Sequence, residues 1–492
     1  MNHFNHELVI IGDGPAGISF FNRLKNQNKN VVLITTSSYP QREDIYTRFS
    51  VIDPASPTTW KFLNSTNHQI SKYEISSITN SNEKFTSVEY FGTGGLSNRW
   101  GAGCAKLNAE DLGINKSFQK SISSYYNEAE EQVGIYYHGE DLLDDYLGKF
   151  KESKVKLNSP KTITFPVCET RWAKIGRTRQ AFLQSEKDGR MPCNNCGGCF
   201  IYCQNKTIYN SQYLLAASLK EIYTSCKVVG LSKINKGYSL RLVNDRGDLT
   251  EITAKFVILA AGTIGSTRLL STLIANPILS SFHHSMISRS IFFGLRREKK
   301  NIFPMGQYIV KVKIDDLQSA HASLIHGTSI PTSDIVDLLP FKNNLIYNLV
   351  NYFKKYLVVA MIFYSSDYSN YKIQLGSGEL QFLDTKLSPK FKSDHQSVLS
   401  RLKGIMKSNH LFTHPLLSSL LPQGSDIHYG GTIPIGPKEY INCTEDCEIR
   451  GFPNLYVVDG SWMPKIPEKS HTFTIIANAI RVADLVASRM NA

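Results

Sequence analysis

The hydrophobic positions of the chain gather in short runs separated by turn and helix signals. Apolar runs at residues 8–11 and 31–34 flank a glycine-rich turn and a helical segment, and further runs lie at 256–262 and 455–460. Short, continuous apolar runs are typical of strands that are buried on both faces of a parallel sheet. A helix is expected to begin near Ser266, after the third run. The order strand, glycine turn, helix, strand predicts half of a dinucleotide-binding unit.

The segment 286–424 has a different pattern. It mixes β-branched and aromatic runs, as at residues 307–312, and it lacks the glycine turns of the flanking regions. We therefore expect it to be an inserted domain, built on an antiparallel sheet. An amphipathic stretch at 335–363 is predicted as a helix of that domain. Because lysines lie near its aromatic residues, a helix in peripheral contact with a membrane remains the alternative.

Composition and charge narrow the class of protein. The chain has 492 residues, 41% of them hydrophobic and 20% charged, which is typical of a folded globular protein. The formal net charge of +13 favours acidic or phosphorylated partners, but no concentrated basic stripe predicts nucleic-acid binding. The sequence has no apolar run of about 18 residues and opens on a strand pattern, so we expect neither a membrane span nor a secretion signal. A cytoplasmic location is the resulting expectation.

A glycine fingerprint follows the first predicted strand. In Gly12-x-Gly14-x-x-Gly17 the first glycine makes the tight turn, the second admits a pyrophosphate and the third packs helix on strand. The unpaired N–H groups of the helix start would bind the phosphates. The acidic residue expected about 20 positions further on is absent, so we predict that the hydroxyl of Thr35 holds the ribose in its place.

A second glycine-dense segment lies at residues 92–103, where backbone is expected to lie against a flat group. This segment resembles the Gly-Gly-x-Ser-x-x-Trp-Gly element of the glucose-methanol-choline (GMC) flavoprotein oxidoreductases, which runs along the isoalloxazine ring. The resemblance continues at residues 126–134, 257–270 and 428–486, and none is found at 286–424. It implies FAD as cofactor. Matching the family's motifs are Gly94, Gly95, Ser97, Asn98, Trp100, Gly101, Ala261, Gly262, Asp459, Gly460 and Thr472, which we expect to bind the cofactor.

The resemblance also implies an overall architecture. We expect an α/β fold in which a discontinuous, Rossmann-like FAD-binding domain surrounds an inserted substrate domain on an antiparallel sheet. The predicted parts are residues 1–285, 286–424 and 425–492, of which the last carries the catalytic histidine.

Two C-terminal elements predict the catalytic residues. His428 begins a His-x-x-Gly-Thr element, which in the resembled family faces the flavin. Removing the proton of an alcohol requires a base that is neutral near pH 7, and histidine meets this requirement. The segment that follows the last predicted strand resembles the family's second active-site element. Two alignments place either His471 or Ser470 at the catalytic position, and we favour His471 on chemical grounds.

Four of the nine cysteines form the run Cys193-x-x-Cys196-x-x-Cys199-x-x-x-Cys203. This is the spacing of a bacterial ferredoxin run, although Gln204 replaces the proline that ends such runs. An iron–sulfur cluster is therefore predicted here, with structural zinc or structural cysteines as the open alternatives.

The expected function is the oxidation of an alcohol or sugar hydroxyl by hydride transfer to FAD. A cluster near the flavin would favour a dehydrogenase with a non-oxygen acceptor. An oxygen-using oxidase and a non-catalytic flavin- or cluster-binding protein are the alternatives. The net charge favours a phosphorylated, acidic or lipid-linked substrate. A pyridine-nucleotide disulfide reductase is not expected, because the sequence lacks a second glycine fingerprint.

Overall fold

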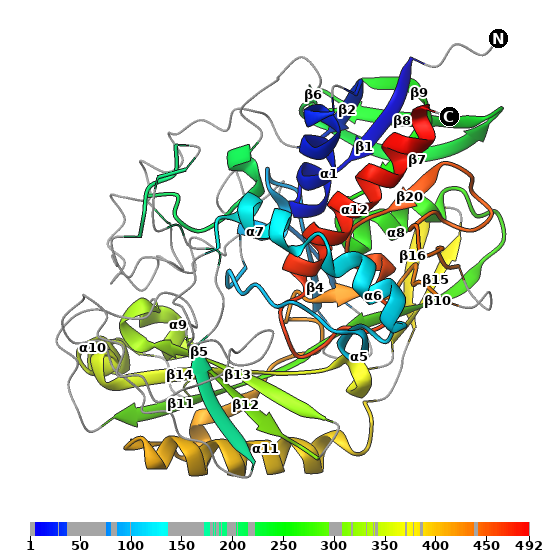
Figure 1. Cartoon of the computed structure of the whole chain (residues 1–492). Coiled ribbons are helices and arrows are strands. Elements are labelled where there is room, and N and C mark those ends of the chain that lie inside the picture. The colour runs from blue at the N-terminus through cyan, green and yellow to red at the C-terminus, as the bar shows by residue number, and fades with distance from the viewer. Residues whose placement is uncertain are drawn as a thin grey trace.

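The computed structural model describes residues 5–36, 75–79, 86–135, 172–177, 181–214, 222–294, 308–383, 387–436 and 441–491, with short internal gaps, the longest at 194–202. Three sheets and a hairpin organise these residues (Figure 1). The first sheet has the order β6 (Ile222–Tyr223), β2 (Val31–Ile34), β1 (His6–Ile11), β9 (Leu249–Leu259), β8 (Gly237–Asn244), β7 (Cys226–Ile234), with β20 (Leu455–Val457) paired to β9.

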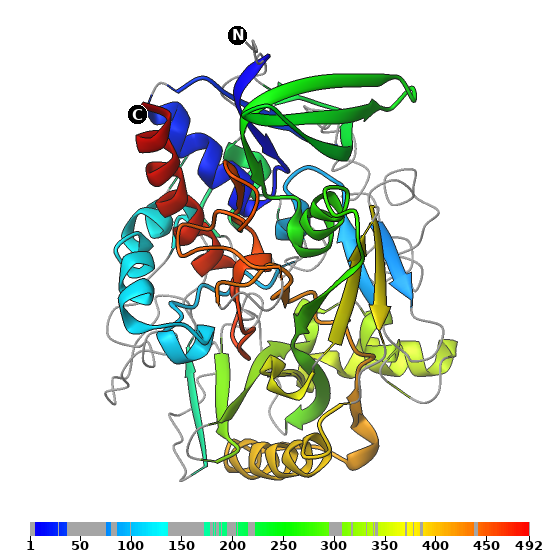
Figure 2. The same cartoon turned by 90° about the vertical axis from the view of Figure 1, so that its right-hand side faces the viewer.

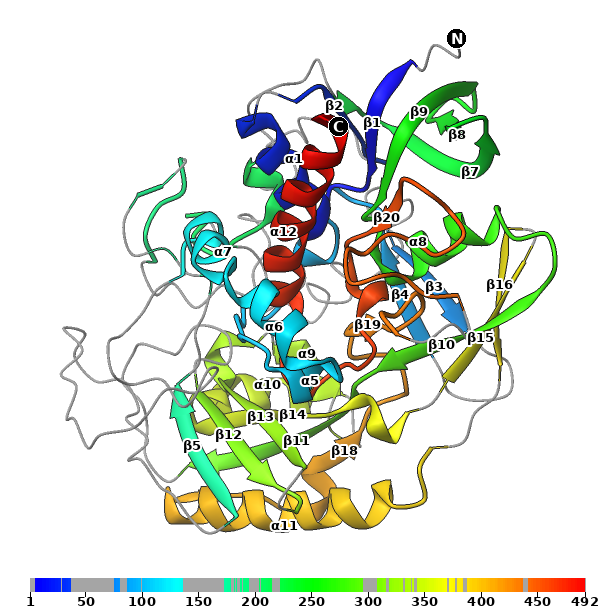
Figure 3. The same ribbon diagram turned by 45° about the vertical axis from the view of Figure 1, so that its right-hand side comes forward.

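The centre of this sheet is parallel. β1 lies between β2 and β9, and β20 continues the parallel pairing along the second half of β9. Strands from the N-terminal, central and C-terminal parts of the chain therefore pair in one sheet, as predicted for a discontinuous Rossmann-like domain. Helices α1 (Pro15–Asn26), α8 (Gly262–Ser271) and α12 (Thr472–Asn491) pack around it, and Figures 1 and 3 show α12 running alongside α1. Because helices cover the central strands, β2 and β20 are buried along their whole length.

The second large sheet, called the substrate sheet below after the domain predicted for residues 286–424, is antiparallel throughout. Its order is β17 (Leu411–Phe412), β11 (Met286–Gly294), β14 (Leu357–Tyr364), β13 (Ser319–His326), β12 (Tyr308–Lys313), β5 (Ala173–Arg177), and β18 (Ser418–Leu420) also pairs with β11. One face of the sheet packs on α11 (Phe391–Ser408), which lies along the bottom of the molecule in Figure 2. The opposite face packs partly on α9 (Thr332–Asp337) and α10 (Asn344–Phe353).

A smaller antiparallel sheet joins the two large ones. Its order is β16 (Glu379–Leu383), β15 (Tyr371–Gly376), β10 (Ile278–His284), β19 (Tyr429–Gly430). Because β10 pairs with β19, the segment that carries His428 is fixed to this smaller sheet. The remaining elements are the hairpin β3 (Ile75–Thr79) and β4 (Thr86–Tyr90), and the helices α5 (Ala109–Leu112), α6 (Lys116–Ser123) and α7 (Tyr126–Val133). In the described ranges no helix is both long and apolar enough to cross a bilayer.

The sequence-based predictions of elements hold for the first sheet and fail in part elsewhere. α8 begins at Gly262, earlier than expected. The stretch 335–363 is not one helix, because α10 ends at Phe353 and residues 357–363 form most of β14, whose apolar residues are needed on both faces of the sheet. β5 comes from the segment assigned to the FAD domain but pairs with β12 of the substrate sheet. The domain boundaries themselves stay a prediction.

Candidate active site

A cavity of about 850 Å³ lies between the two large sheets. It begins at the turn between β1 and α1, passes the glycine-dense segment and the start of α8, and ends against the substrate sheet. Of the residues predicted to bind the cofactor or to catalyse, those that line it are Gly12, Gly14, Gly95, Ser97, Trp100, Gly101, Ala261, Gly262, His428, Asp459, Gly460, Ser470, His471 and Thr472.

The turn before α1 has the shape that a dinucleotide requires. A Cβ at Gly17 would lie 1.9 Å from the carbonyl oxygen of Gly12, and Gly12 itself has φ +106°, so neither position accepts a side chain. A Cβ at Gly14 would meet no atom within 4 Å, because Gly14 faces the cavity. Pro15 opens the helix, and no side chain caps its first turn in the described structure. This turn and the start of α1, together called the phosphate cradle below, fit the pyrophosphate of FAD.

Asp13 explains why Thr35 does not reach the cavity. The Asp13 carboxylate accepts a hydrogen bond from the backbone N–H of Gly94 at 3.2 Å and one from the hydroxyl of Thr35. Burial raises the pKa of Asp13 to about 6. The neighbouring Thr36 lines the cavity instead, and its hydroxyl donates to the carbonyl of Phe91 at 2.5 Å. The position of the side chains therefore favours Thr36, from the same Thr35-Thr36-Ser37-Ser38 run, over the predicted Thr35 for the contact with the ribose.

The glycine-dense segment approaches the dinucleotide turn directly. A Cβ at Gly95 would lie 3.3 Å from Cα of Gly14, and Gly95 has φ +54°. Ser97 donates to the carbonyl of Gly94 at 2.5 Å, which closes the turn, and the indole N–H of Trp100 donates to the carbonyl of Tyr209 at 2.9 Å. Gly94 supports the turn without lining the cavity. The side chain of Asn98 lies outside the described structure.

The loop after β20 closes the cavity beside α8. Asp459 accepts hydrogen bonds from the backbone N–H of Ser461 at 3.0 Å and from the hydroxyl of Ser266, and burial raises its pKa. A Cβ at Gly460 would lie 2.4 Å from the carbonyl oxygen of Tyr429, so the loop and β19 pack backbone against backbone. The loop therefore packs against β19, the strand that directly follows His428.

The two predicted histidines meet at the far end of the cavity. The ring centroids of His428 and His471 are 5.1 Å apart, with the planes at 79°, and Phe363 stacks on His428 at 5.3 Å. Desolvation lowers the pKa of His428, and desolvation together with the nearby His428 lowers the pKa of His471 to about 3. Both imidazoles are therefore neutral near pH 7, as a proton acceptor must be.

Neighbouring groups hold these rings in place. The backbone N–H of His428 donates to Asp426 at 3.3 Å, and Asp426 also accepts from the backbone N–H of Ser285 at 2.7 Å. Neither Nδ1 atom of His428 and His471 has a hydrogen-bond partner within the described structure. Ser470 also lines the cavity, but the ring contact with His428 is made by His471. This geometry favours His471 over Ser470 as the second active-site residue.

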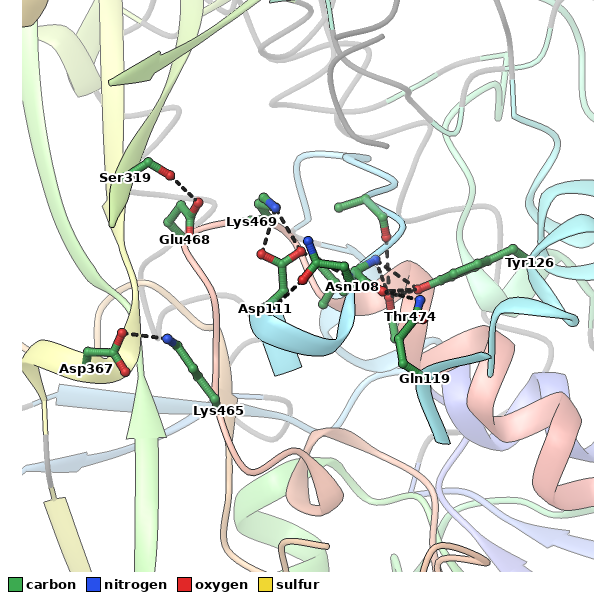
Figure 4. Close-up of polar contacts among 12 residues, drawn as sticks. Asn108, Asp111, Gln119, Tyr126, Ser319, Asp367, Lys465, Glu468, Lys469 and Thr474 are labelled. Atoms are coloured by element: carbon green, nitrogen blue, oxygen red, sulfur yellow. Dashed lines mark hydrogen bonds and ion pairs between the residues drawn. The ribbon is translucent and has the colours of Figure 1, made fainter. Parts of the chain in front are cut away.

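Three polar contacts fix the segment that leads to His471, and Figure 4 shows them together. Lys465 pairs with Asp367 at 2.6 Å, and Glu468 accepts from Ser319 at 2.9 Å. Lys469 donates to both carboxylate oxygens of Asp111, at 2.7 and 2.8 Å. None of these partners was predicted, because each pair joins residues far apart in sequence.

The substrate sheet contributes a third histidine. His321 of β13 lines the cavity, and desolvation together with the charge of Lys469 lowers its pKa to about 3. No motif surrounds His321 in the sequence, so only its place on the cavity wall identifies it.

The cysteine run is only partly described. Cys193 and Cys203 lie in the described structure, where the Cys203 sulfur accepts from the backbone N–H of Thr207 at 3.2 Å, but Cys196 and Cys199 lie outside it. Among the residues that the structure describes, no group of three or more His, Cys, Asp or Glu could hold a metal ion. The four-cysteine cluster therefore stays a prediction.

Comparison with solved structures shows which proteins share the fold of this chain. The chain has the fold of pyridoxine 4-oxidase from Mesorbium loti (TM-score 0.61, 12% identity, 98% of this chain and 99% of that chain covered). It is similarly close to an FAD-dependent oxidoreductase from Chaetomium thermophilum, solved with a bound fragment (TM-score 0.60, 12% identity, 99% and 100% covered). A comparison with curated protein sequences found no match.

The chain therefore shares its fold with these two solved proteins. The family model for GMC oxidoreductases matches residues 418–479, the region that holds the two predicted active-site histidines and the loop after β20. These matches confirm the resemblance to the GMC oxidoreductases that the motifs predict.

Proposed function

We propose that this chain is an FAD-dependent dehydrogenase that oxidises an alcohol or a sugar hydroxyl, with an acceptor other than oxygen. The observation that carries the proposal is the pair His428 and His471, two neutral imidazoles in contact at the end of the cavity that begins at the dinucleotide turn. When bound, FAD supplies a two-electron acceptor for the hydride of the substrate.

The residues of the chain have separable roles in this proposal. The glycine turn and the start of α1 bind the pyrophosphate, and the glycine-dense segment holds the ring system. His428 accepts the hydroxyl proton of the substrate at a ring nitrogen while the carbinol hydride leaves. His471 orients the same hydroxyl, and Phe363 restricts the tilt of His428 by stacking on it. Burial of both imidazoles excludes water from the reacting hydroxyl.

Anaerobic reduction of the purified, FAD-loaded protein tests this function. A panel of primary alcohols and sugars is mixed with the protein, and loss of the flavin absorbance band is followed. Reduction by at least one alcohol supports the proposal. Tightly bound FAD that no alcohol reduces would support a flavin-binding protein without this activity.

The identity of the electron acceptor distinguishes the dehydrogenase from an oxygen-using oxidase. A solved protein with this fold is named an oxidase, which favours an oxygen-using enzyme as the second candidate. Reoxidation of the reduced protein is therefore measured with air-saturated buffer and with a quinone or a one-electron dye. Fast reoxidation by the quinone or dye and slow reoxidation by oxygen support the dehydrogenase; the reverse order supports the oxidase.

We further propose that Cys193, Cys196, Cys199 and Cys203 bind an iron–sulfur cluster that carries electrons from the flavin. Only their ferredoxin-like spacing supports this step. Iron and zinc are assayed in the wild type and in the double variant Cys196→Ser/Cys199→Ser. Iron that is stoichiometric in the wild type and lost in the variant supports the cluster. Zinc in place of iron, or neither metal, would assign the cysteines a structural role.

A further inference from the structure

Helix α10 is apolar on two opposite sides. Its inner side packs on the core, where Tyr347 and Val350 join the apolar cluster beneath α9 and α10. Its outer side exposes Leu345, Leu349 and Tyr352, whose spacings of four and three residues place them on one face. A surface helix usually carries polar residues on its outer face, and a helix that is apolar all round is usually covered. The outer side of α10 therefore indicates a contact surface.

Apolar residues of two neighbouring elements extend this surface. Phe293, at the end of β11, lies opposite Phe412 of β17, and both are exposed. Because side chains alternate along a strand, Phe293 is on the same face as Ile291, which belongs to the cluster beneath α10. The short helix η8 (Pro415–Leu417) leaves 72% of Leu416 exposed, and its last residue packs against the same cluster.

Seven exposed side chains form this surface, which we call the outer patch. They are Phe293, Leu345, Leu349, Tyr352, Phe353, Phe412 and Leu416. Single exposed apolar residues are common on folded proteins. Several of them on adjoining elements indicate instead a place of contact with another molecule or with a membrane.

The segments that carry the outer patch have positive charges and no negative ones. Residues 343–366 and 395–425 include every member of the patch except Phe293, and their sequence contains four lysines, one arginine and no Asp or Glu. One of these lysines lies at the patch itself, because Nζ of Lys355 is 4.3 Å from the ring centroid of Tyr352. The outer patch therefore combines an apolar face with a cation at its edge.

This combination fits the surface of an anionic phospholipid bilayer. The apolar side chains of an amphipathic helix enter the boundary between headgroups and acyl chains, while lysines stay at the level of the anionic headgroups. A second copy of the chain fits less well, because a two-fold interface would bring the same acid-free segments together. The cores of protein interfaces are also depleted of lysine.

The outer patch lies close to the cavity wall. The cluster beneath α10 includes Val359, and the partly buried Ile330 and Met361 pack against it. All three residues also line the cavity. The apolar cluster that supports α10 is therefore continuous with the wall of the cavity, and contact of the patch with a bilayer would hold this wall towards the membrane.

We propose that the outer patch binds this protein peripherally to an anionic phospholipid bilayer. Helix α10 lies in the plane of the interface, with Leu345, Leu349 and Tyr352 below the headgroups and Lys355 among them. This inference goes beyond the proposed function and does not depend on it, because it concerns the surface on which the protein works.

Flotation with lipid vesicles tests the proposal on the FAD-loaded full chain. We expect binding to vesicles of phosphatidylcholine with phosphatidylserine, and weaker binding to phosphatidylcholine alone. Leu345→Gln/Tyr352→Gln should lower the affinity for the anionic vesicles by at least about 10-fold, because both apolar side chains would leave the interface. Lys355→Gln should lower it by about 5-fold, the effect of one charge at the headgroups.

The matched controls lie on the first sheet. Leu249 of β9 and Leu345 are both 67% exposed, and Figure 1 shows β9 far from α10. Leu249→Gln should therefore leave the vesicle affinity unchanged, and so should Lys233→Gln at an exposed position of β7. FAD content and thermal unfolding are measured for every variant, so that a folding defect is distinguished from a loss of membrane binding.

Three results would overturn the proposal. They are a wild type that binds neither kind of vesicle, a Leu345→Gln/Tyr352→Gln variant that binds as well as the wild type, and an equal loss of binding in Leu249→Gln. Analytical ultracentrifugation without lipid is the second measurement. A wild-type dimer that becomes a monomer in the double variant would assign the outer patch to a second copy of the chain and would also overturn the proposal.

Discussion

The ammonium group of Lys469 donates to both carboxylate oxygens of Asp111, at 2.7 and 2.8 Å, and so ties α5 to the segment that ends in His471. Both side chains are mostly buried, with 16% and 12% exposed. We therefore expect Lys469→Met to lower the free energy of unfolding by about 1–3 kcal/mol, because the mostly buried Asp111 carboxylate would lose this cation and keep the backbone N–H of Asn108. Denaturant titration of the FAD-loaded protein measures the loss.

The matched control is the exposed pair Lys390 and Asp315, whose side chains are 58% and 43% exposed. Lys390→Met should change the free energy of unfolding by less than about 1 kcal/mol. If the contact also positions His471, Lys469→Met will lower kcat more than it raises KM, and the Lys390 variant will change neither. Equal losses of stability in the two variants would contradict the importance that we assign to the Asp111 contact.

The sequence predicted the parts of the site that depend on local pattern. Gly12 and Gly17 mark a turn at positions that accept no side chain, and the His-x-x-Gly-Thr element placed His428 without knowledge of the fold. Residues that reach the site only through the tertiary structure are not surrounded by a recognisable sequence motif. Arg289 and His321 become part of one wall only through the register of β11, β14 and β13, which the sequence pattern does not specify.

The incorrect helix prediction at 335–363 and the unforeseen place of β5 have physical causes of the same kind. The run that forms β14 is apolar on both faces, because one face covers α11 and the other faces the cavity and α10. Such a run cannot be told from a buried helix by periodicity alone. β5 pairs with β12 across more than a hundred residues of sequence, so its place in the substrate sheet was not predictable from its neighbours.

Removal of either active-site imidazole should slow flavin reduction rather than prevent FAD binding. We expect His428→Ala to lower the anaerobic reduction rate by at least about 100-fold, the loss that is typical of a missing general base. His471→Ala should lower it by a similar or smaller factor, and Ser470→Ala should have the smallest effect. Stopped-flow absorbance measures the rates at saturating alcohol. His414→Ala, at an exposed position outside the cavity lining, is the control. A larger loss in Ser470→Ala than in His471→Ala would reverse our assignment.

Two glycines of the fingerprint should respond differently to alanine. Gly14→Ala adds a methyl group that points into open cavity, so we expect the fold to persist and the FAD content to fall. Gly17→Ala places a Cβ 1.9 Å from the carbonyl of Gly12, so we expect a lower melting temperature of the apoprotein as well. Flavin content after gel filtration and thermal unfolding of the apoprotein separate the two effects. A wild-type FAD content in Gly14→Ala would argue against the phosphate cradle.

Buried neutral histidines should make the fold sensitive to acid. The pKa of His321 is lowered to about 3, whereas an unfolded histidine titrates near 6.5, so between these values the unfolded chain binds more protons than the folded one. Stability is therefore full above about pH 6.5 and falls as the pH decreases toward 3, by up to about 1.4 kcal/mol per pH unit for each such histidine. His321→Gln should reduce this slope, measured by denaturant unfolding at pH 7, 6 and 5, while His414→Ala should not. An unchanged slope in His321→Gln would mean that His321 takes up its proton in the folded protein.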